Sequence, residues 1–479
     1  MNFRKLFSNE DLLAVWIGVI ILALISVVHF SQYDNVKEKY DVAVTESMAN
    51  GTGESVSVKS MEIGVAKTVK SLVATPKKWE VSPLDSIRPE GKTTLLVSML
   101  GLFVFILALF GTGVKLMGES FKKFAVSLAG VFLIAIISFV LAGQTEVSYL
   151  GINYAIWAIA IGIIISNTVG VPEWLKPAIR SEYYIKTGLV IMGAEILINK
   201  ILAIGLPGIF VAWIVTPIVL ITTYIFGQKV LKLKSKSLNM TICADMSVCG
   251  VSAAIATASA TKAKKEELTI AITLSMIFTV VMMVVLPMIA KALGLSEVIA
   301  GAWLGGTLDS TGAVVAAGNF IGDTALNVAA TIKMIQNVLI GVVAFCVALY
   351  WAIYVERTPD APRPKPIEIW TRFPKFLLGF VGMSIVFSIL YTNLDKSMAS
   401  AMIDNGIIKG FTKDFKDWLF CLAFVCIGLN TNFKEFSKHI QGTKHITLYC
   451  CGQLFNILLT LGMAYLMFNI VFPDITSKI

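Results

Sequence analysis

Long apolar runs restrict how this chain can fold more than any other feature. They recur along the sequence at about 17 to 25 residues, the length that an α-helix needs to cross the hydrocarbon core of a bilayer. Only 15% of the residues are charged, whereas a soluble protein carries charge at about a quarter of its positions. We therefore predict an all-α polytopic membrane protein in contact with a lipid bilayer.

The runs predict about eleven full spans and two interrupted elements. The spans are expected at about 12–30, 94–114, 124–142, 149–168, 186–200, 206–227, 268–291, 331–354, 375–392, 415–431 and 446–471. The interrupted elements are expected near 239–261 and 303–322. Three domains follow, namely an amino-terminal anchor at 1–30, a polar extracytoplasmic insert at 31–92 and a transporter domain at 93–479.

Basic residues concentrate in short loops, which orients the chain in the membrane. Cytoplasmic loops of membrane proteins carry an excess of lysine and arginine. The basic loops at 229–236 and 355–375 agree with a cytoplasmic amino terminus in a bacterial inner membrane. Because the net charge of +9 gathers in such loops, we expect no nucleic-acid partner. The interrupted elements could cross the membrane or re-enter, and the lysines at 262, 264 and 265 favour re-entry.

The two interrupted elements resemble each other. The first contains Cys243–Ala256, CADMSVCGVSAAIA, and the second Gly305–Gly318, GGTLDSTGAVVAAG, with Gly250 aligned on Gly312. Backbone that leaves the helical form at membrane depth is tolerated only where it is buried in protein or lines a watery cavity. A matched pair of such breaks points to the binding site of a secondary transporter built from inverted repeats.

Four of the ionisable residues in or beside apolar segments are candidates for a functional role: Glu195, Asp245, Asp309 and Lys333. Such a residue costs on the order of 2.5–3.5 kcal/mol to insert, so it is functional by default. We expect Asp245 and Asp309 to bind a coupling ion, Na⁺ or H⁺. The alternatives are a helix cap at the membrane surface for either aspartate, snorkelling for Lys333 and surface exposure for Glu195.

Small and hydroxyl-bearing residues of both elements form the predicted substrate site. The amino terminus of a half-helix, with its free N–H groups and positive dipole end, suits an anion. We therefore expect a small anion as substrate. The candidate substrate-binding residues are Ser247, Cys249, Gly250, Ser252, Thr307, Ser310, Thr311, Gly312, Lys333 and Gln336.

Catalytic motifs are missing from the sequence. It contains no GxxxxGK[ST] phosphate loop, no HExxH and no GxSxG, and its three histidines do not cluster. We therefore expect neither an enzyme nor a cofactor, apart from Na⁺ as a possible coupling ion at the two aspartates.

The interrupted elements resemble the bacterial sulfate exporter family of membrane transporters. The resemblance lies in Ser247–Ala256, in Trp303 through Gly318 and in the helix that begins Thr331-Ile-Lys333. It implies an inverted-repeat fold similar to that of sodium/proton antiporters and bile-acid symporters, in which a mobile core moves against a scaffold in an elevator-like cycle. It also implies export of sulfate, sulfite or a sulfonate or organic acid, by a homodimer.

The chain departs from the family's pattern at the polar positions. The family's His-acid pair is Asp309-Ser310 here, its Gln is Ala313, its Arg is Gln336, and Asp245 replaces a small residue. Fewer basic and more acidic groups weaken the expectation of a doubly charged anion. Two alternatives stay open, a cation/proton antiporter and the membrane subunit of a sodium-pumping decarboxylase complex.

Overall fold

A computed structural model of the chain is helical, as the apolar runs predict. It describes residues 10–49, 69–88, 94–149, 153–196, 198–356, 374–433 and 443–476. Within these ranges, the β-structure is limited to an isolated bridge between Trp79 and Gln144. The prediction of an all-α polytopic membrane protein is confirmed.

Eight helices in the described part of the chain are long and apolar enough to cross a membrane. They cover Glu10–Phe30, Leu95–Leu116, Phe121–Ala142, Ile204–Val230, Lys265–Ala292, Asp323–Val355, Phe376–Asn393 and Thr443–Val471. Three other expected spans are helices that are too short or too highly charged to count among these eight. Helix α9 (Tyr154–Thr168) has 15 residues and α10 (Ser181–Met192) has 12. Helix α23 (Lys413–Asn430) carries four charges in its first five positions.

The chain divides into two compact units, so residues 93–479, expected as one transporter domain, contribute to both. The first unit comprises Met1–Gly162, Val171–Ile198 and Lys375–Gly428. The second comprises Ile163–Gly170, Asn199–Pro374 and Leu429–Ile479.

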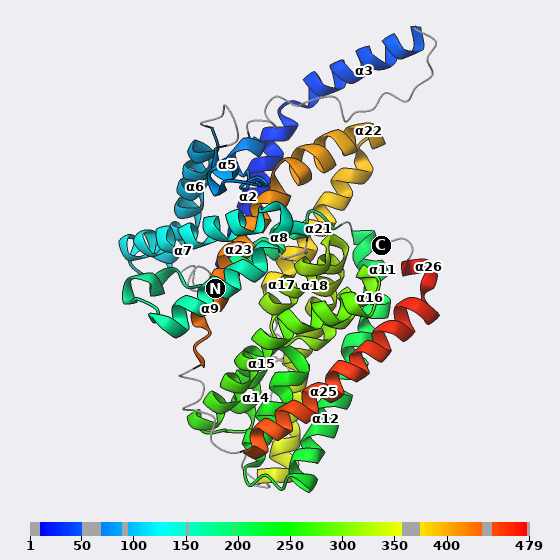
Figure 1. Ribbon diagram of the computed structural model, residues 1–479. Coiled ribbons are helices and arrows are strands. Elements are labelled where there is room, and N and C mark those ends of the chain that lie inside the picture. The colour runs from blue at the N-terminus through cyan, green and yellow to red at the C-terminus, as the bar shows by residue number, and fades with distance from the viewer. Residues whose placement is uncertain are drawn as a thin grey trace. The chain divides into compact units, whose positions relative to one another are not determined.

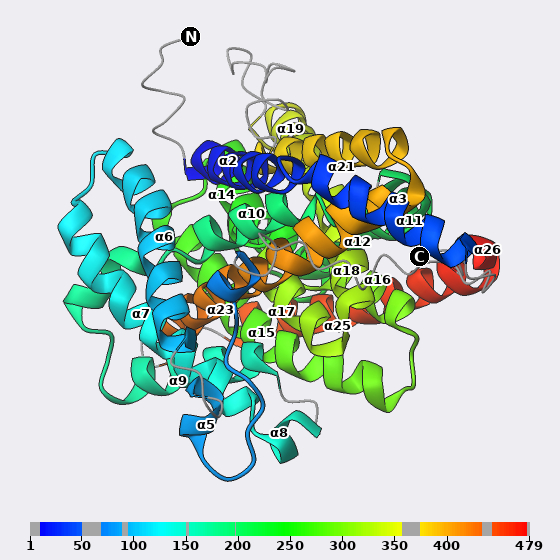
Figure 2. The same ribbon diagram turned by 90° about the horizontal axis from the view of Figure 1, so that it is seen from above.

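Helix α2 (Glu10–Phe30) is packed inside the first unit. It lies against α10 and α21 (Phe376–Asn393), while α6 (Thr94–Leu116) lies beside α7 (Phe121–Ala142) (Figure 2). The insert expected at 31–92 contributes α3 (Tyr33–Ala49) and α5 (Pro83–Ile87) to this unit, and its residues 50–68 and 89–92 lie outside the described part.

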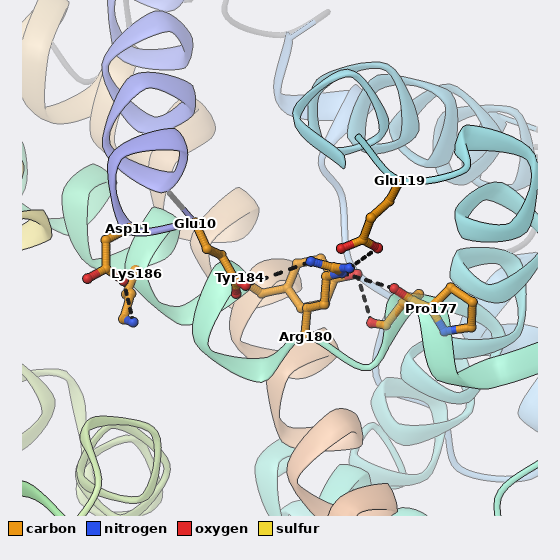
Figure 3. Close-up of polar contacts among 8 residues, drawn as sticks. Glu10, Asp11, Glu119, Pro177, Arg180, Tyr184 and Lys186 are labelled. Carbon is orange, nitrogen blue, oxygen red and sulfur yellow. Dashed lines mark hydrogen bonds and ion pairs between the residues drawn. The ribbon is translucent and has the colours of Figure 1, made fainter. Parts of the chain in front are cut away.

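Ion pairs fasten the start of α2 to the rest of the first unit (Figure 3). The Arg180 guanidinium pairs with Glu119 and lies 3.7 Å from the Glu10 carboxylate. The Lys186 Nζ atom lies 2.6 Å from the Asp11 carboxylate. Helix α2 is therefore held by charge as well as by apolar packing.

The first interrupted element, in the second unit, is a helical hairpin. Its arms are α13 (Lys236–Ala244), which continues as a π-helical segment to Cys249, and α14 (Val251–Ala260). The hydroxyls of Ser235 and Ser237 donate to the Glu267 carboxylate at the start of α15 (Lys265–Ala292), at 2.6 and 2.8 Å. The element thus begins and ends at the same place, which we call the first base.

The second interrupted element is a hairpin of the same kind. Its arms are α16 (Glu297–Thr307) and α17 (Thr311–Ile321), and α18 (Asp323–Asn337) follows directly. The Glu297 carboxylate accepts hydrogen bonds from the backbone N–H groups of Thr324 and Ala325, at 3.1 and 3.4 Å. These contacts form the second base.

The two bases lie at opposite ends of α15. This helix has 28 residues and is therefore about 42 Å long. Glu267 is in its first turn, and Glu297 follows its last residue by five positions. A Cβ atom placed on Gly250 would lie 3.3 Å from the Ser275 Oγ atom, midway along α15, and 3.4 Å from the Asp309 carbonyl oxygen. The hairpins enter from opposite ends and their tips meet.

Two further helices pack beside the hairpins in this unit. They are α12 (Val215–Ile225) and α25 (Thr443–Tyr465), which contact each other, while α14 runs beside α15 (Figure 1). Helix α25 also packs against α16, and α18 continues into α19 (Leu339–Tyr350). Side chains of α12, α15, α18 and α25 can therefore reach the tips.

Candidate functional site

Each tip is a short piece of non-helical backbone. Gly250 has φ +61° and ψ −130°, a backbone conformation that residues other than glycine rarely adopt. The second tip is extended at Leu308 and Ser310, and the Ser310 hydroxyl accepts a hydrogen bond from the Ala313 N–H at 3.1 Å. The sequence therefore breaks the first element with a glycine and the second with a serine cap.

Lys333 of α18 joins the two tips. Its Nζ atom donates three hydrogen bonds of 2.7 Å, to the carbonyl oxygens of Val248 and Leu308 and to the Gln336 side chain. Val248 and Leu308 lie at the ends of the first arms of their hairpins. Because the side chain is only 1% exposed, the snorkelling alternative is wrong.

Gln336, one turn further along α18, extends this contact. Its amide nitrogen lies 3.1 Å from the Ser247 carbonyl oxygen and 3.2 Å from that of Gly306. It also lies 3.1 Å from the Thr216 hydroxyl of α12. At both tips the helical hydrogen-bonding pattern ends and leaves backbone carbonyl oxygens without partners. Side chains of α18 donate hydrogen bonds to these oxygens.

Asp309 lies at the second tip within a set of donors. Its carboxylate accepts hydrogen bonds from the hydroxyl of Tyr449, the amide of Gln453 at 3.2 Å and the hydroxyl of Thr279 at 3.4 Å. The residue is 1% exposed. The alternative of an aspartate that caps a helix at the surface does not fit this position.

Asp245 is at the end of α13, fully buried, and lacks such donors. It interacts electrostatically with Asp309 and Lys333, and the Ser275 hydroxyl is nearby. Neither carboxylate oxygen accepts a hydrogen bond of acceptable geometry from a described residue. The two predicted coupling-ion aspartates are thus brought into one site with different surroundings.

The remaining predicted residues fall into two groups. Ser247, Cys249, Thr307, Thr311 and Gly312 are buried at or near the tips, together with Gly250. Ser310 is half-buried, and Ser252 is exposed in the first turn of α14, outside the buried contacts.

Three side chains of α25 at the site were missed by the sequence argument. Besides Tyr449 and Gln453, the Asn456 amide lies 3.3 Å from the Met246 carbonyl oxygen and 3.4 Å from that of Thr307. Their spacing of four and three residues places them on one face of a helix. That polar stripe in an apolar span was the available signal.

Glu195 is not part of this site. It belongs to the first unit, where its carboxylate pairs with the Lys416 ammonium and accepts a hydrogen bond from the Thr412 hydroxyl. The two charged side chains are 10% and 4% exposed, so the alternative of surface exposure is wrong.

These features define a class, the multi-pass α-helical membrane proteins, here with two opposed helical hairpins. A family profile described as Conserved hypothetical protein 698 matches residues 126–448, which include both hairpins and most of the chain. The chain belongs to this family. No solved structure matches it.

Curated relatives of the chain carry the name UPF0324 membrane protein. One from Rhodopirellula baltica is 48% identical over 98% of this chain and 92% of its own length. Another, from Nitratidesulfovibrio vulgaris, is 57% identical over 80% of this chain and 65% of its own length. A third, from Clostridium perfringens, is 31% identical over 56% of this chain and 79% of its own length. These names agree with a membrane location and specify no activity.

Proposed function

We propose that this protein is a secondary active transporter of a small anion, with the junction of the two hairpin tips as its binding site. The observation that supports this most directly is the meeting of hairpins from opposite ends of α15 around two buried carboxylates and a buried lysine. Such breaks are found where transporters bind substrate and coupling ions. We interpret each hairpin with its following span as one of two inverted repeats, of the kind found in antiporters and bile-acid symporters.

The orientation of the half-helices supports an anionic substrate. Helices α14 and α17 both begin at the tips, so their amino-terminal N–H groups and positive dipole ends face the junction. The first turn of α14 has no side-chain cap. Sulfate, sulfite, a sulfonate or another small organic acid fits this chemistry, with Ser247, Cys249 and Thr311 as nearby polar groups.

The second candidate function is a cation/proton antiporter without an anionic substrate. Two buried carboxylates at one junction favour it, because carboxylates bind protons and hard cations. In both candidates the second unit carries the site, and the protein acts in the bacterial inner membrane as a homodimer, with neither an enzymatic reaction nor a cofactor.

Reconstitution of the purified full chain tests the proposal. We expect uptake or release of radiolabelled sulfate, sulfite or a small sulfonate by proteoliposomes under a Na⁺ or pH gradient. Asp309→Asn should abolish gradient-driven transport, whereas Asp85→Asn, at an exposed position of the first unit, should not.

The other outcomes separate the alternatives. Sodium/proton exchange without transport of any anion would establish the antiporter. A chain that is inert in every assay would favour a membrane subunit that needs soluble partners. Unchanged anion transport by Asp309→Asn would remove this carboxylate from the mechanism.

A further inference from the structure

We propose that the coupling ion at the tip junction is a proton carried by Asp245, and that Na⁺ does not bind there. This inference rests on the proposed transport function and names its coupling chemistry. It follows from how the donors and acceptors of the junction are distributed among Lys333, Asp309 and Asp245.

Lys333 already donates hydrogen bonds to the carbonyl oxygens that would be expected to coordinate a sodium ion. Exposed carbonyl oxygens at the ends of half-helices are typical Na⁺ ligands in transporters. Here those of Val248 and Leu308 each accept a 2.7 Å hydrogen bond from the Lys333 ammonium. The third ammonium proton goes to Gln336, so the group has no hydrogen left for either aspartate.

Asp309 has the surroundings of an ionised carboxylate. An ionised carboxylate only accepts hydrogen bonds, and three donors converge on it, from Tyr449, Gln453 and Thr279. The charges of Asp309 and Lys333 then balance within the junction. A second negative charge at the same depth would be left without compensation.

Asp245 is the group that would bring that second charge. It is fully buried, with the Ser275 hydroxyl beside it, and its oxygens receive no hydrogen bond of good geometry from described residues, whereas Asp309 receives three. An isolated buried carboxylate is so unfavourable in its charged form that it takes up a proton. In the described residues, no cluster of three or more His, Cys, Asp or Glu side chains surrounds it that could bind a metal ion instead.

The other titratable groups around Asp245 supply no positive charge that would compensate an ionised Asp245. They are Lys333 from α18, Tyr449 from α25, Asp309 from the second tip and the thiols of Cys243 and Cys249 from its own hairpin. Helix α14 has no titratable residue, and those of α15 lie at its two ends. Only Lys333 is cationic, and its donors are committed to other acceptors.

Proton release then has a defined consequence. When the O–H bond of Asp245 breaks and the proton moves to water, a carboxylate stays behind beside Asp309. Repulsion between the two carboxylates, together with the need of the new charge for water, favours separation of the tips. Protonation returns the junction to its neutral, closed arrangement.

Infrared spectroscopy of the reconstituted full chain in phosphatidylethanolamine–phosphatidylglycerol vesicles tests the inference without a transported solute. At neutral pH we expect the carbonyl absorption of a protonated buried carboxyl group. It should be lost in Asp245→Asn and kept in Asp309→Asn. If Asp245→Asn does not fold, a wild-type titration replaces it, and the absorption should give way to that of a carboxylate as the pH rises.

Sodium binding is the second measurement. Calorimetric titration of the wild type with NaCl, against choline chloride as control, should give no heat from a saturable site. A saturable Na⁺ site that disappears in Asp245→Asn would overturn the inference, as would a carboxyl absorption that Asp245→Asn leaves unchanged. A protein with the expected absorption that transports no anion would instead contradict the proposed function alone.

Discussion

Gly250 is the residue whose backbone most directly shapes the junction. Alanine at this position would adopt a strained conformation, at a cost of roughly 1–3 kcal/mol. Its Cβ atom would also lie 3.3 Å from the Ser275 Oγ atom and 3.4 Å from the Asp309 carbonyl oxygen. We expect Gly250→Ala to lower the thermal unfolding temperature in detergent and to reduce transport.

Gly294→Ala is the matched control for Gly250. Gly294 also has a positive φ, +64°, but nothing lies within 4 Å of its Cβ position. The difference between the two variants therefore measures the crowding at the tips. Equal losses of stability would mean that the close approach of the tips is unimportant.

Lys333 stabilises the junction through three acceptors at once. Lys333→Met would leave the carbonyl oxygens of Val248 and Leu308 buried without this partner, and hydrogen bonds to charged groups contribute about 1.5–3 kcal/mol each. We expect a far lower unfolding temperature than for Lys236→Met, a lysine that is exposed. Similar unfolding temperatures would contradict the bridging role.

The sequence predicted part of the site's residues for a physical reason. Charges such as Asp245, Asp309 and Lys333 are conspicuous in apolar sequence because they cost so much to bury. Tyr449 and Asn456 are uncharged and occur in many spans, so only their helical spacing marked them. Which aspartate receives hydrogen-bond donors depends on how α25 packs, and no local pattern encodes that.

At the scale of elements, a single glutamate closes each hairpin at its base. Glu267 accepts hydrogen bonds from Ser235 and Ser237 and from the Lys264 N–H. Glu267→Ala removes all of these, and losing a capping side chain costs about 1 kcal/mol. We expect faster amide hydrogen exchange in α13 and α14 and a modest loss of thermal stability.

Glu266→Ala provides the comparison for this prediction. Glu266 is the neighbouring residue in the same helical turn and is exposed. Exchange rates that rise equally in both variants would show that Glu267 has no particular role in closing the hairpin.

Element types were easier to predict than element lengths. Apolar runs predicted the long spans. The lysines around Lys264 favoured re-entry of the first interrupted element, which folds as a helical hairpin, and its entry into the membrane stays a prediction. The expected span at 186–200 was less accurate, whereas that at 415–431 agrees with α23 (Lys413–Asn430) in bounds but not in the charge at its start. Helix α10 ends at Met192, and α23 carries a buried ion pair near its start, through Lys416. A run of apolar letters does not reveal such a partner.

At the scale of the whole molecule, the opposed bases predict opposite sidedness in the membrane. The first base is rich in lysine, which favours the cytoplasmic side. We expect an impermeant maleimide added outside cells to label Ala292→Cys, near the second base, and not Lys264→Cys, at the first. The exposed cysteines Cys346, Cys450 and Cys451 are replaced by serine beforehand.

Membrane disruption supplies the control for this labelling. Both introduced cysteines should react once the cells are permeabilised, because Lys264 and Ala292 are exposed. Labelling of both from the outside in intact cells would contradict hairpins that enter from opposite faces. Which residues form each of the two units was not predicted, because hydrophobicity indicates that a helix is buried but not which helices it contacts.

One ammonium group links both tips, and this makes their separation cooperative. Withdrawal of one hairpin alone breaks the ammonium's hydrogen bond to that tip and leaves an ammonium hydrogen and a buried carbonyl oxygen unpaired, so partial opening gains little. The separated state is then a rare conformation at rest, and a solute that populates it must bind it more tightly than it binds the joined state. In the proposed transporter, the same lysine would suppress leakage through a half-open intermediate.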